Sequence, residues 1–216
     1  PGPVLIDIPK DVTANKAEYT REEIQPFAPD GGQISEEEID RAVAMIEEAK
    51  QPFVFVGGGA VLSGASEELR EFVEKVDAPV TDSLMGKGAF PGTDERYTGM
   101  LGMHGTKTSN FGVSECDLLI VLGARFSDRV TGNTQTFAKN AKILQFDVDP
   151  AEMNKNVLIT AGVTGDIREA LKRVNKKLSR LSHPEWMERI QEYKQQYPMK
   201  YHPDTLTGPF VIEEIF

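Results

Sequence analysis

Short apolar runs that lead directly into glycine are the feature of this sequence that most limits its fold. Residues 117–132 read DLLIVLGARFSDRVTG, so five apolar residues, Leu118–Leu122, run straight into Gly123. Residues 53–56 run in the same way into the glycines at 57–59. A short, wholly apolar run bounded by polar residues is typical of a parallel strand that is covered on both faces. The sequence therefore predicts a buried parallel sheet.

Helical patterns alternate with these runs. Ser35 and Asp166 are each followed three residues later by glutamate, which is the pattern of a capping box at the start of a helix. Other helical patterns lie at 69–76, at 184–190 and from residue 211 onward. Further strands are expected at 4–8, 78–81, 143–148 and 157–159, whereas 11–33 reads as a surface linker and 93–112 as a polar, glycine-bearing stretch. This alternation predicts an α/β fold, a doubly wound, mainly parallel six-stranded sheet with helices on both faces.

Composition excludes several classes of function. The formal net charge of −10 argues against a general nucleic-acid-binding protein, whose surface is basic. Cys116 is the single cysteine, so no intrachain disulfide and no cysteine-rich zinc site is expected, which fits a reducing cytoplasm. No other metal-ligand spacing occurs. No apolar run approaches the length of a membrane span, and no signal peptide precedes the first expected strand. The chain opens on Pro1 without methionine, which indicates a piece of a longer protein.

Unusual residues gather just after the expected strands, at 57–59, 83–88, 123–132, 147–149 and 165–166. The carboxyl ends of parallel strands meet at one edge of a sheet, and ligands bind there in open α/β sheets. Several loops are therefore expected to line a single crevice. Glycine lets the backbone turn close to a ligand, and Arg125 and Arg129 are placed to hold an anion. The simpler alternative is a buried strand followed by a solvated turn with two surface arginines.

The glycines at 57–59 suit either a phosphate-cradling turn or a flexible strand-to-helix turn. They do not make the dinucleotide fingerprint, because Leu62 stands where G-x-G-x-x-G requires its third glycine. They do not make a P-loop either, because Ala65 stands where that motif requires lysine. An ATPase or GTPase is therefore rejected.

Two other residues and one pair of acids leave two interpretations each. His104, between glycines, is either a ligand contact or a loop side chain, and Met103 either lines a cofactor or fills the core. Asp147 and Asp149 would face opposite sides of a strand, which is poor geometry for an acid–base pair. A single acid at a strand end suits ribose-type hydroxyls better. No arrangement of serine, histidine and acid indicates a hydrolase.

Seven segments together resemble the central domain of the large, catalytic subunit of the acetohydroxyacid (acetolactate) synthase family. They are PGPVLIDIPKDV at the start, VGGGA at 56–60, LMGKGAFP at 84–91, LGMHGT at 101–106, LGARFSDRVTG at 122–132, DVDPAE at 147–152 and GDI at 165–167. They occur in the family's order over almost the whole chain. The LGMHG and GARF-x-DRVTG segments are specific within the wider group of thiamine diphosphate enzymes.

The resemblance implies an enzyme that condenses two 2-oxo acids, pyruvate with pyruvate or 2-oxobutyrate, with release of CO2 in branched-chain amino-acid biosynthesis. The first and third domains of that family bind thiamine diphosphate and Mg²⁺ between subunits, and the middle, Rossmann-like domain binds FAD without net redox work. It further implies a homodimer or tetramer and a small regulatory subunit. The expected divisions are 1–34 for the end of a preceding domain and a linker, 35–182 for the FAD-binding domain, and 183–216 for a helix and linker to the next domain.

The resemblance also implies the site residues. Arg129 corresponds to the arginine that anchors the carboxylate of the acceptor 2-oxo acid, and Met103 to a residue lining the substrate channel. The positions implied to contact FAD are Gly57, Gly58, Gly59, Ser83, Leu84, Met85, Leu101, Gly102, Met103, His104, Gly123, Ala124, Arg125, Ser127, Arg129, Val130, Asp147, Val148, Gly165 and Asp166.

Two departures from the family pattern matter. Ser127 stands where the family often has aspartate. The glutamate that activates thiamine diphosphate belongs to the preceding domain, and the Gly-Asp-Gly…Asn-Asn motif for Mg²⁺ belongs to the following one. Here Gly165-Asp166 is followed by Ile167, which is not that motif, so this chain alone is expected to be inactive. It is also expected to bind FAD weakly, because the neighbouring domains of the family normally help to enclose the flavin.

Two other readings compete with this one, and a third is excluded. A pyruvate oxidase holds a redox-active FAD in the same kind of domain, but the LGMHG and DRVTG segments favour the synthase. A non-catalytic nucleotide-binding module, comparable to an electron-transfer flavoprotein domain, is the alternative from another class. A sirtuin-like deacylase would need four cysteines for its zinc ion, and one is present.

Overall fold

The computed structural model describes residues 3–20, 34–200 and 205–215. The chain divides into two compact units, 1–30 and 31–216. In the first unit, helix α1 (Lys10–Ala14) is the one regular element of residues 3–20, and none of these residues is buried. The strand predicted at 4–8 is therefore wrong. Its four large apolar side chains are 59% to 94% exposed, and no described residue pairs with its backbone, without which a strand is not stable.

Helix α1 also corrects the linker predicted at 11–33, because it occupies residues 10–14. The rest of that prediction, at 21–33, lies outside the described residues.

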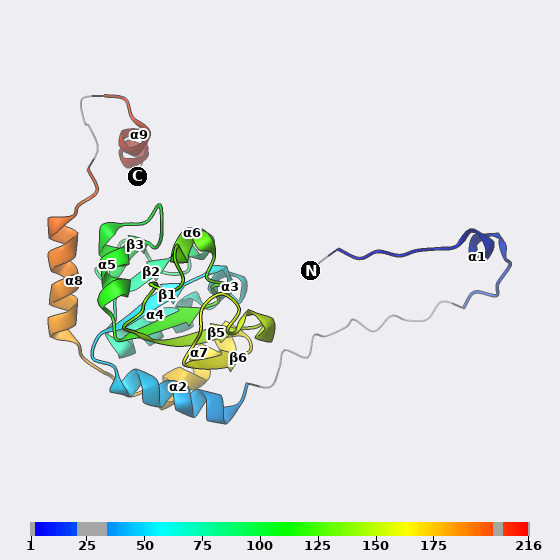
Figure 1. Ribbon diagram of the computed structural model, residues 1–216, viewed down its shortest axis with the longest axis horizontal. Helices are drawn as coiled ribbons and strands as arrows, with labels where there is room; N and C mark the ends of the chain where they lie inside the picture. The colour runs from blue at the N-terminus through cyan, green and yellow to red at the C-terminus, as the bar shows by residue number, and fades with distance from the viewer. Residues whose placement is uncertain (1–2, 21–33, 201–204, 216) are drawn as a thin grey trace. The chain divides into compact units, whose positions relative to one another are not determined.

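The second unit is built on a six-stranded, entirely parallel sheet (Figure 1). Its strands are β1 (Pro52–Val56), β2 (Val80–Asp82), β3 (Tyr97–Met100), β4 (Leu118–Leu122), β5 (Lys142–Asp147) and β6 (Ala161–Thr164). They lie in the order β3-β2-β1-β4-β5-β6. The first strand, β1, thus lies at the centre of the sheet, and β2 and β3 extend the sheet to one edge. The chain then returns to the centre, where β4 pairs with the other side of β1, and β5 and β6 extend the sheet to the opposite edge. This is the predicted doubly wound α/β fold, and its topological switch point lies between β1 and β4.

Helices cover both faces of this sheet, as predicted. The helices of the second unit are α2 (Glu36–Glu48), α3 (Gly58–Leu62), α4 (Ser66–Val76), α5 (Lys107–Glu115), α6 (Asp128–Thr131), α7 (Ile167–Lys177), α8 (Pro184–Gln196) and α9 (Gly208–Ile215), with 3₁₀ turns η1 (Leu84–Gly86) and η2 (Pro150–Glu152). Alternate strand residues separate the core into two halves. Val54 and Ile120 pack with α2, α4 and α7, whereas Phe55 and Val121 pack on the face of α5 and α8. No described helix has both the length and the apolar character that crossing a membrane requires.

Helix α8 lies beside α5 (Figure 1) and is fixed by buried side chains. Proline stands at its first position, as predicted. Trp186 Nε1 donates a 2.9 Å hydrogen bond to the carbonyl oxygen of Pro52. The Trp186 ring meets Phe53 edge to face, with ring centroids 6.4 Å apart. Ile190 is fully buried on the same helix. The helix predicted from residue 211 is also present, as α9.

The stretch at 93–112 contains two elements that its sequence does not indicate, β3 and α5. Both depend on hydroxyl groups instead of apolar periodicity. Thr106 Oγ1 caps α5 by accepting a hydrogen bond from the Ser109 amide. The Thr98 hydroxyl on β3 lies 2.8 Å from that of Ser109, inside the protein. Polar contacts of this kind produce no apolar periodicity, so the sequence pattern does not indicate these two elements.

Three local predictions are corrected. The strand expected at 157–159 begins at Ala161 instead, because the ladder with β5 starts there. Ser35 precedes α2, but its side chain makes no capping bond, and Glu38 Oε2 accepts instead from the amide of Thr164 on β6. At α7 half of the capping box forms. Asp166 Oδ1 accepts from the Glu169 amide, whereas the Glu169 side chain pairs with Lys172.

Candidate functional site

The loops that follow the strands leave the sheet side by side at one edge. The first residue after each of five strands donates its amide hydrogen to the carbonyl oxygen of a neighbouring strand. These bonds run from Gly57 to Leu122, from Ser83 to Val56, from Leu101 to Asp82, from Gly123 to Phe146 and from Gly165 to Asp147, at 2.8 to 2.9 Å. The structure thus brings the segments singled out in the sequence to one shared rim.

Glycines form the centre of this rim, where the loops of β1 and β4 cross. The Gly59 amide donates a 3.0 Å hydrogen bond to the carbonyl oxygen of Gly123. A Cβ atom at Gly57 would lie 2.2 Å from that same oxygen, and one at Gly59 would lie 2.7 Å from the Gly123 Cα. Gly123 itself has a φ of +64°, which side chains disfavour. Two backbones can therefore meet at the switch point only because no side chain separates them.

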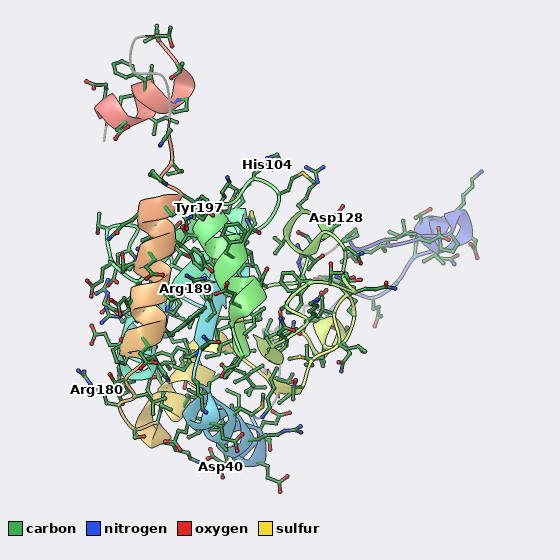
Figure 2. The ribbon with its side chains drawn as sticks, turned by 60° about the vertical axis from the view of Figure 1, so that its left-hand side comes forward. Asp40, His104, Asp128, Arg180, Arg189 and Tyr197 are labelled. Atoms are coloured by element: carbon green, nitrogen blue, oxygen red, sulfur yellow. The ribbon has the colours of Figure 1, made fainter. Side chains whose placement is uncertain are left out.

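The segment 101–104 packs directly on the segment that carries the second arginine. The Met103 amide donates a 2.9 Å hydrogen bond to the carbonyl oxygen of Arg129. Gly102, at φ +97°, has no room for a Cβ, which would lie 2.5 Å from that oxygen. The side chain of Asn110 on α5 holds the other side of this turn, because it accepts from the Gly102 amide and donates to the Gly102 carbonyl oxygen. Figure 2 labels His104 and Asp128 at this end of the unit.

Asn110 is a supporting residue that sequence reasoning missed. It lies in the stretch where no helix was expected, so nothing indicated that its amide would face Gly102.

Two cationic side chains at the rim have no partner in the described part of the chain. Arg125 and Arg129 are exposed, and no described residue forms an ion pair or hydrogen bond with either guanidinium group. The carboxylate of the neighbouring Asp128 accepts from the backbone amide of Arg129 and pairs with neither guanidinium group. Most other arginines of the second unit, such as Arg168 and Arg173, are paired with carboxylates. A guanidinium offers a planar fork of donors that suits a carboxylate or a phosphate.

Large apolar side chains are exposed on the same rim. Leu84 is 71% exposed, Met85 72%, Met103 68% and Val148 60%. Gly58 lies against Met85, because a Cβ atom added to this glycine would be 3.0 Å from the Cβ atom of Met85. Apolar side chains in such a position are normally covered by a flat ligand or by another part of the protein. Apolar side chains beside two arginines that have no described partner fit a ligand that combines aromatic rings with negative charge.

The carboxylates at the end of β5 have separate environments. Asp147 is buried, at 7% exposure, and its Oδ1 accepts a 3.0 Å hydrogen bond from the Asp149 amide. Burial raises the pKa of the Asp147 carboxyl, and the nearby charge of Glu152 adds to the rise, against the lowering by the Asp149 amide. Asp149 instead caps η2, because it accepts from the Ala151 amide. The two acids therefore do not form a pair, which agrees with the sequence-based expectation.

Several predicted site residues also have structural tasks. The Ser83 hydroxyl accepts from the Gly86 amide at 3.2 Å and so closes η1. Asp166 caps α7. Ala124 and Gly165 are buried. Ser127 precedes α6 without a side-chain capping bond and is exposed. Leu101 is buried, whereas His104 and Val130 lie at the surface or partly so.

A second group that sequence reasoning missed holds the loop after β2. The buried carboxylate of Asp82 accepts from the Tyr97 hydroxyl at 2.8 Å and from Lys87 Nζ at 3.3 Å. Burial raises the pKa of Tyr97, and its bond to Asp82 adds to this. Partial burial alone would lower the pKa of Lys87, but its bonds to Tyr97 and Asp82 outweigh that and raise it. Because Tyr97 belongs to the unexpected strand β3, no pattern joined these residues in advance.

Comparison with known proteins places this site in a family context. The model of the family described as "Thiamine pyrophosphate enzyme, central domain" matches residues 39–174, which include all six strands. Among similar proteins is the acetolactate synthase large subunit of Parasynechococcus marenigrum, 47% identical over 211 residues, which are 94% of this chain and 34% of that protein. The corresponding subunit of Cyanidium caldarium is 42% identical over 231 residues, 100% of this chain and 39% of that protein.

A bacterial relative gives the same result. The acetolactate synthase isozyme 2 large subunit of Escherichia coli is 38% identical over 221 residues, 100% of this chain and 39% of that protein. The chain thus spans between a third and two fifths of the length of these curated relatives.

Proposed function

Because the chain belongs to the thiamine pyrophosphate enzyme central-domain family, we propose that it is the central domain of an acetolactate synthase large subunit and holds FAD at its strand-end rim. The full protein would condense pyruvate with a second pyruvate or with 2-oxobutyrate and release CO2. The domain would span 35–182, preceded by the end of another domain at 1–34 and followed by a helix and linker at 183–216. The identities of 38% to 47% to acetolactate synthase large subunits support this assignment.

The observation that carries the FAD proposal is the rim itself, where two arginines without a partner among the described residues stand among exposed apolar side chains. Leu84, Met85 and Val148 offer apolar surface to flat rings, and Arg125 offers a cation to the phosphates. The glycines at 57–59 bring the backbone close to the ligand without side chains in between. The buried Asp147 is suited to accept hydrogen bonds from ribose hydroxyls. The remaining positions proposed to line the site are those that the family resemblance implies.

Arg129 has the role closest to the chemistry in this proposal. Its guanidinium would bind the carboxylate of the acceptor 2-oxo acid through two parallel hydrogen bonds. Met103, whose amide is bonded to the Arg129 carbonyl oxygen, would line the approach to the same point. Together the two residues orient the acceptor and exclude water from one side of it.

The other cofactors of the proposed enzyme are held outside this chain. Thiamine diphosphate would supply the carbanion chemistry, with Mg²⁺ on its diphosphate, and both would be bound by the preceding and following domains. FAD would serve as a structural element without net redox work. We therefore expect this chain alone to be inactive.

We also propose the partners of the full protein. It would form a homodimer or tetramer, bind a small regulatory subunit, and work in the cytoplasm without nucleic acid or membrane. The word "large" in the relatives' names supports a smaller partner. The net charge of −10 gives no support to nucleic-acid binding.

Titration of the purified full-length protein with FAD and with NAD tests the proposal. We expect quenching of flavin fluorescence and a clear preference for FAD, whereas a preference for NAD would overturn the assignment. Anaerobic addition of pyruvate to the protein loaded with FAD, thiamine diphosphate and Mg²⁺ then separates the two flavoenzyme readings. A synthase keeps its flavin oxidised while acetolactate accumulates, whereas bleaching of the flavin would indicate an oxidase. FAD binding without either reaction would indicate a non-catalytic nucleotide-binding module.

A further inference from the structure

The loop that carries Arg125 is held in an unfavourable backbone conformation. Phe126 has a φ of +51°, in the left-handed region that residues with side chains rarely adopt. Its ring is 3% exposed and lies between Phe55 and Phe137, with centroids 6.5 and 6.0 Å away. Strained residues persist where their surroundings hold them, and they gather at ligand sites. The buried ring therefore fixes one end of the turn.

Two side-chain amides hold the other end. Asn156 Nδ2 donates a 2.9 Å hydrogen bond to the carbonyl oxygen of Arg125, and Gln145 Nε2 donates one of 3.4 Å to the carbonyl oxygen of Ala124. No backbone amide in the described ranges donates to either oxygen. Consecutive carbonyl groups of this loop are thus bound from two separate places, strand β5 and the segment before β6.

Gln145 occupies a position where the fold favours an apolar side chain. It pairs with Val121 in the ladder of β4 and β5, on the face that also buries Phe55 and Ile143, and it is 0% exposed. Its Oε1 has no hydrogen-bond partner among the described residues. Burying a polar group that is only partly satisfied lowers stability. A structural role for its single hydrogen bond, to the Ala124 carbonyl oxygen, explains why an amide stands at this buried position.

We infer that Gln145 and Asn156 are positioning residues for Arg125. They fix the backbone at 124–126 and so set the direction in which the Arg125 side chain leaves the loop, toward the negatively charged part of the nucleotide. This inference rests on the proposed function, because the direction of Arg125 matters only if the rim binds an anionic ligand. Neither residue contacts the ligand in this arrangement.

The chain contains a matched control for a buried amide. Asn175 on α7 is 3% exposed, its Nδ2 donates a 2.9 Å hydrogen bond to the carbonyl oxygen of Glu68, and its Oδ1 has no described partner. It is therefore buried almost as completely as Gln145 and has the same bonding pattern. It lies between α4 and α7, on the opposite face of the sheet.

The first measurement needs no cofactor. Hydrogen–deuterium exchange is followed by mass spectrometry in the flavin-free full-length protein for a peptide covering residues 124–131. We expect exchange in this peptide to become about tenfold faster in Gln145→Met and in Asn156→Ala, and to be unchanged in Asn175→Leu. Unchanged exchange in both of the first two variants would overturn the inference. Asn156 is exposed, so Asn156→Ala keeps the test valid even if Gln145→Met fails to fold.

The second measurement asks whether the effect passes through Arg125. We expect the Kd for FAD to rise about tenfold in Gln145→Met and in Asn156→Ala, and to stay within twofold in Asn175→Leu. Combined with Arg125→Ala, neither variant should weaken binding much further, because the side chain that they position is gone. Fully additive effects would show that the amides act independently of Arg125 and would refute its role. If the unaltered protein binds no FAD, the proposed function fails, whereas the exchange result still decides whether the amides hold the loop.

Discussion

The amide of Met103 donates a 2.9 Å hydrogen bond to the carbonyl oxygen of Arg129. The two residues proposed to face the acceptor 2-oxo acid therefore leave from segments that are bonded to each other, although these segments follow different strands. Gly102 makes this contact possible, since any side chain there would meet the same oxygen. The position of Arg129 thus depends on a glycine that itself touches no substrate.

Gly102→Ala tests that dependence. We expect a loss of about 1–2 kcal/mol from the positive φ and a further loss of about 1–3 kcal/mol from the clash with Arg129, read from urea unfolding. Gly88→Ala is the matched control, because Gly88 has a φ of +90° but open space around its Cα. The control should lose only the first part. Equal losses in the two variants would mean that the contact between the segments is not tight.

Arg129→Ala should separate function from stability. Loss of a hydrogen bond to a charged group costs about 1.5–3 kcal/mol, so kcat/KM for the acceptor 2-oxo acid should fall about 10- to 100-fold. Arg129→Lys should recover only part of this, because lysine keeps the charge without the planar fork. The free energy of unfolding should change by less than about 0.5 kcal/mol, since the guanidinium has no described partner. Arg70→Ala on α4 is the charge-matched control for steady-state kinetics.

Tyr97→Phe tests the group around Asp82. Removal of the phenol leaves the buried carboxylate with Lys87 alone, which should lower the free energy of unfolding by about 2 kcal/mol at pH 7. The pKa values of Lys87 and Tyr97 are both raised, so both hold their protons more tightly in the folded state. Their contribution is full below about pH 10 and is lost as the pH rises through the folded pKa values.

Urea unfolding between pH 7 and pH 11 measures that effect. The fall in stability above about pH 10 should be shallower in Tyr97→Phe than in the unaltered protein. Tyr19→Phe, at a tyrosine that is 85% exposed, serves as the control and should follow the unaltered protein. Parallel pH profiles for all three proteins would contradict the expectation.

Asp147→Asn should stabilise the fold at pH 7 and weaken the binding of FAD. The raised pKa of Asp147 means that its charged form is disfavoured in the fold, so this residue contributes less stability as the pH rises through its folded pKa. At pH 7 the asparagine variant should unfold at higher temperature, and this advantage should disappear in acid, where the aspartate is protonated. The Kd for FAD should rise about tenfold, because an amide is a weaker acceptor for ribose hydroxyls. A variant that is less stable at pH 7 would contradict this prediction.

Strands with purely apolar runs could be predicted from the sequence, and so could the edge at which their loops meet. Leu118–Leu122 and Gly123 suffice for this, because burial on both faces leaves a continuous signal and parallel pairing fixes which ends gather. The strand β3 could not be predicted, since Tyr97–Met100 is only half-buried and includes a glycine with φ +93°. The predicted strand at 4–8 failed for the opposite reason. Its apolar pattern is clear, but the described chain offers it no neighbour.

The supporting contacts of the site were beyond sequence reasoning because they join distant residues through polar atoms. Asn156 bonds to a carbonyl 31 positions earlier, and Gln145 to one 21 positions earlier. His183 was expected only to begin a helix, yet its ring nitrogens lie 2.8 Å from the Val76 carbonyl oxygen and 3.1 Å from that of Ala49. Polar side chains in loops have no periodicity, so only the fold reveals their partners.

The crossing of the glycine turns after β1 and β4 has a consequence for synthesis of the protein on the ribosome. Gly57 and Gly59 emerge early, but the backbone against which they pack belongs to Gly123. A nascent chain that ends before Gly123 contains the glycine turn after β1 but lacks the backbone against which this turn packs. If the rim binds FAD as proposed, binding must therefore wait until the residues around Gly123 have been translated.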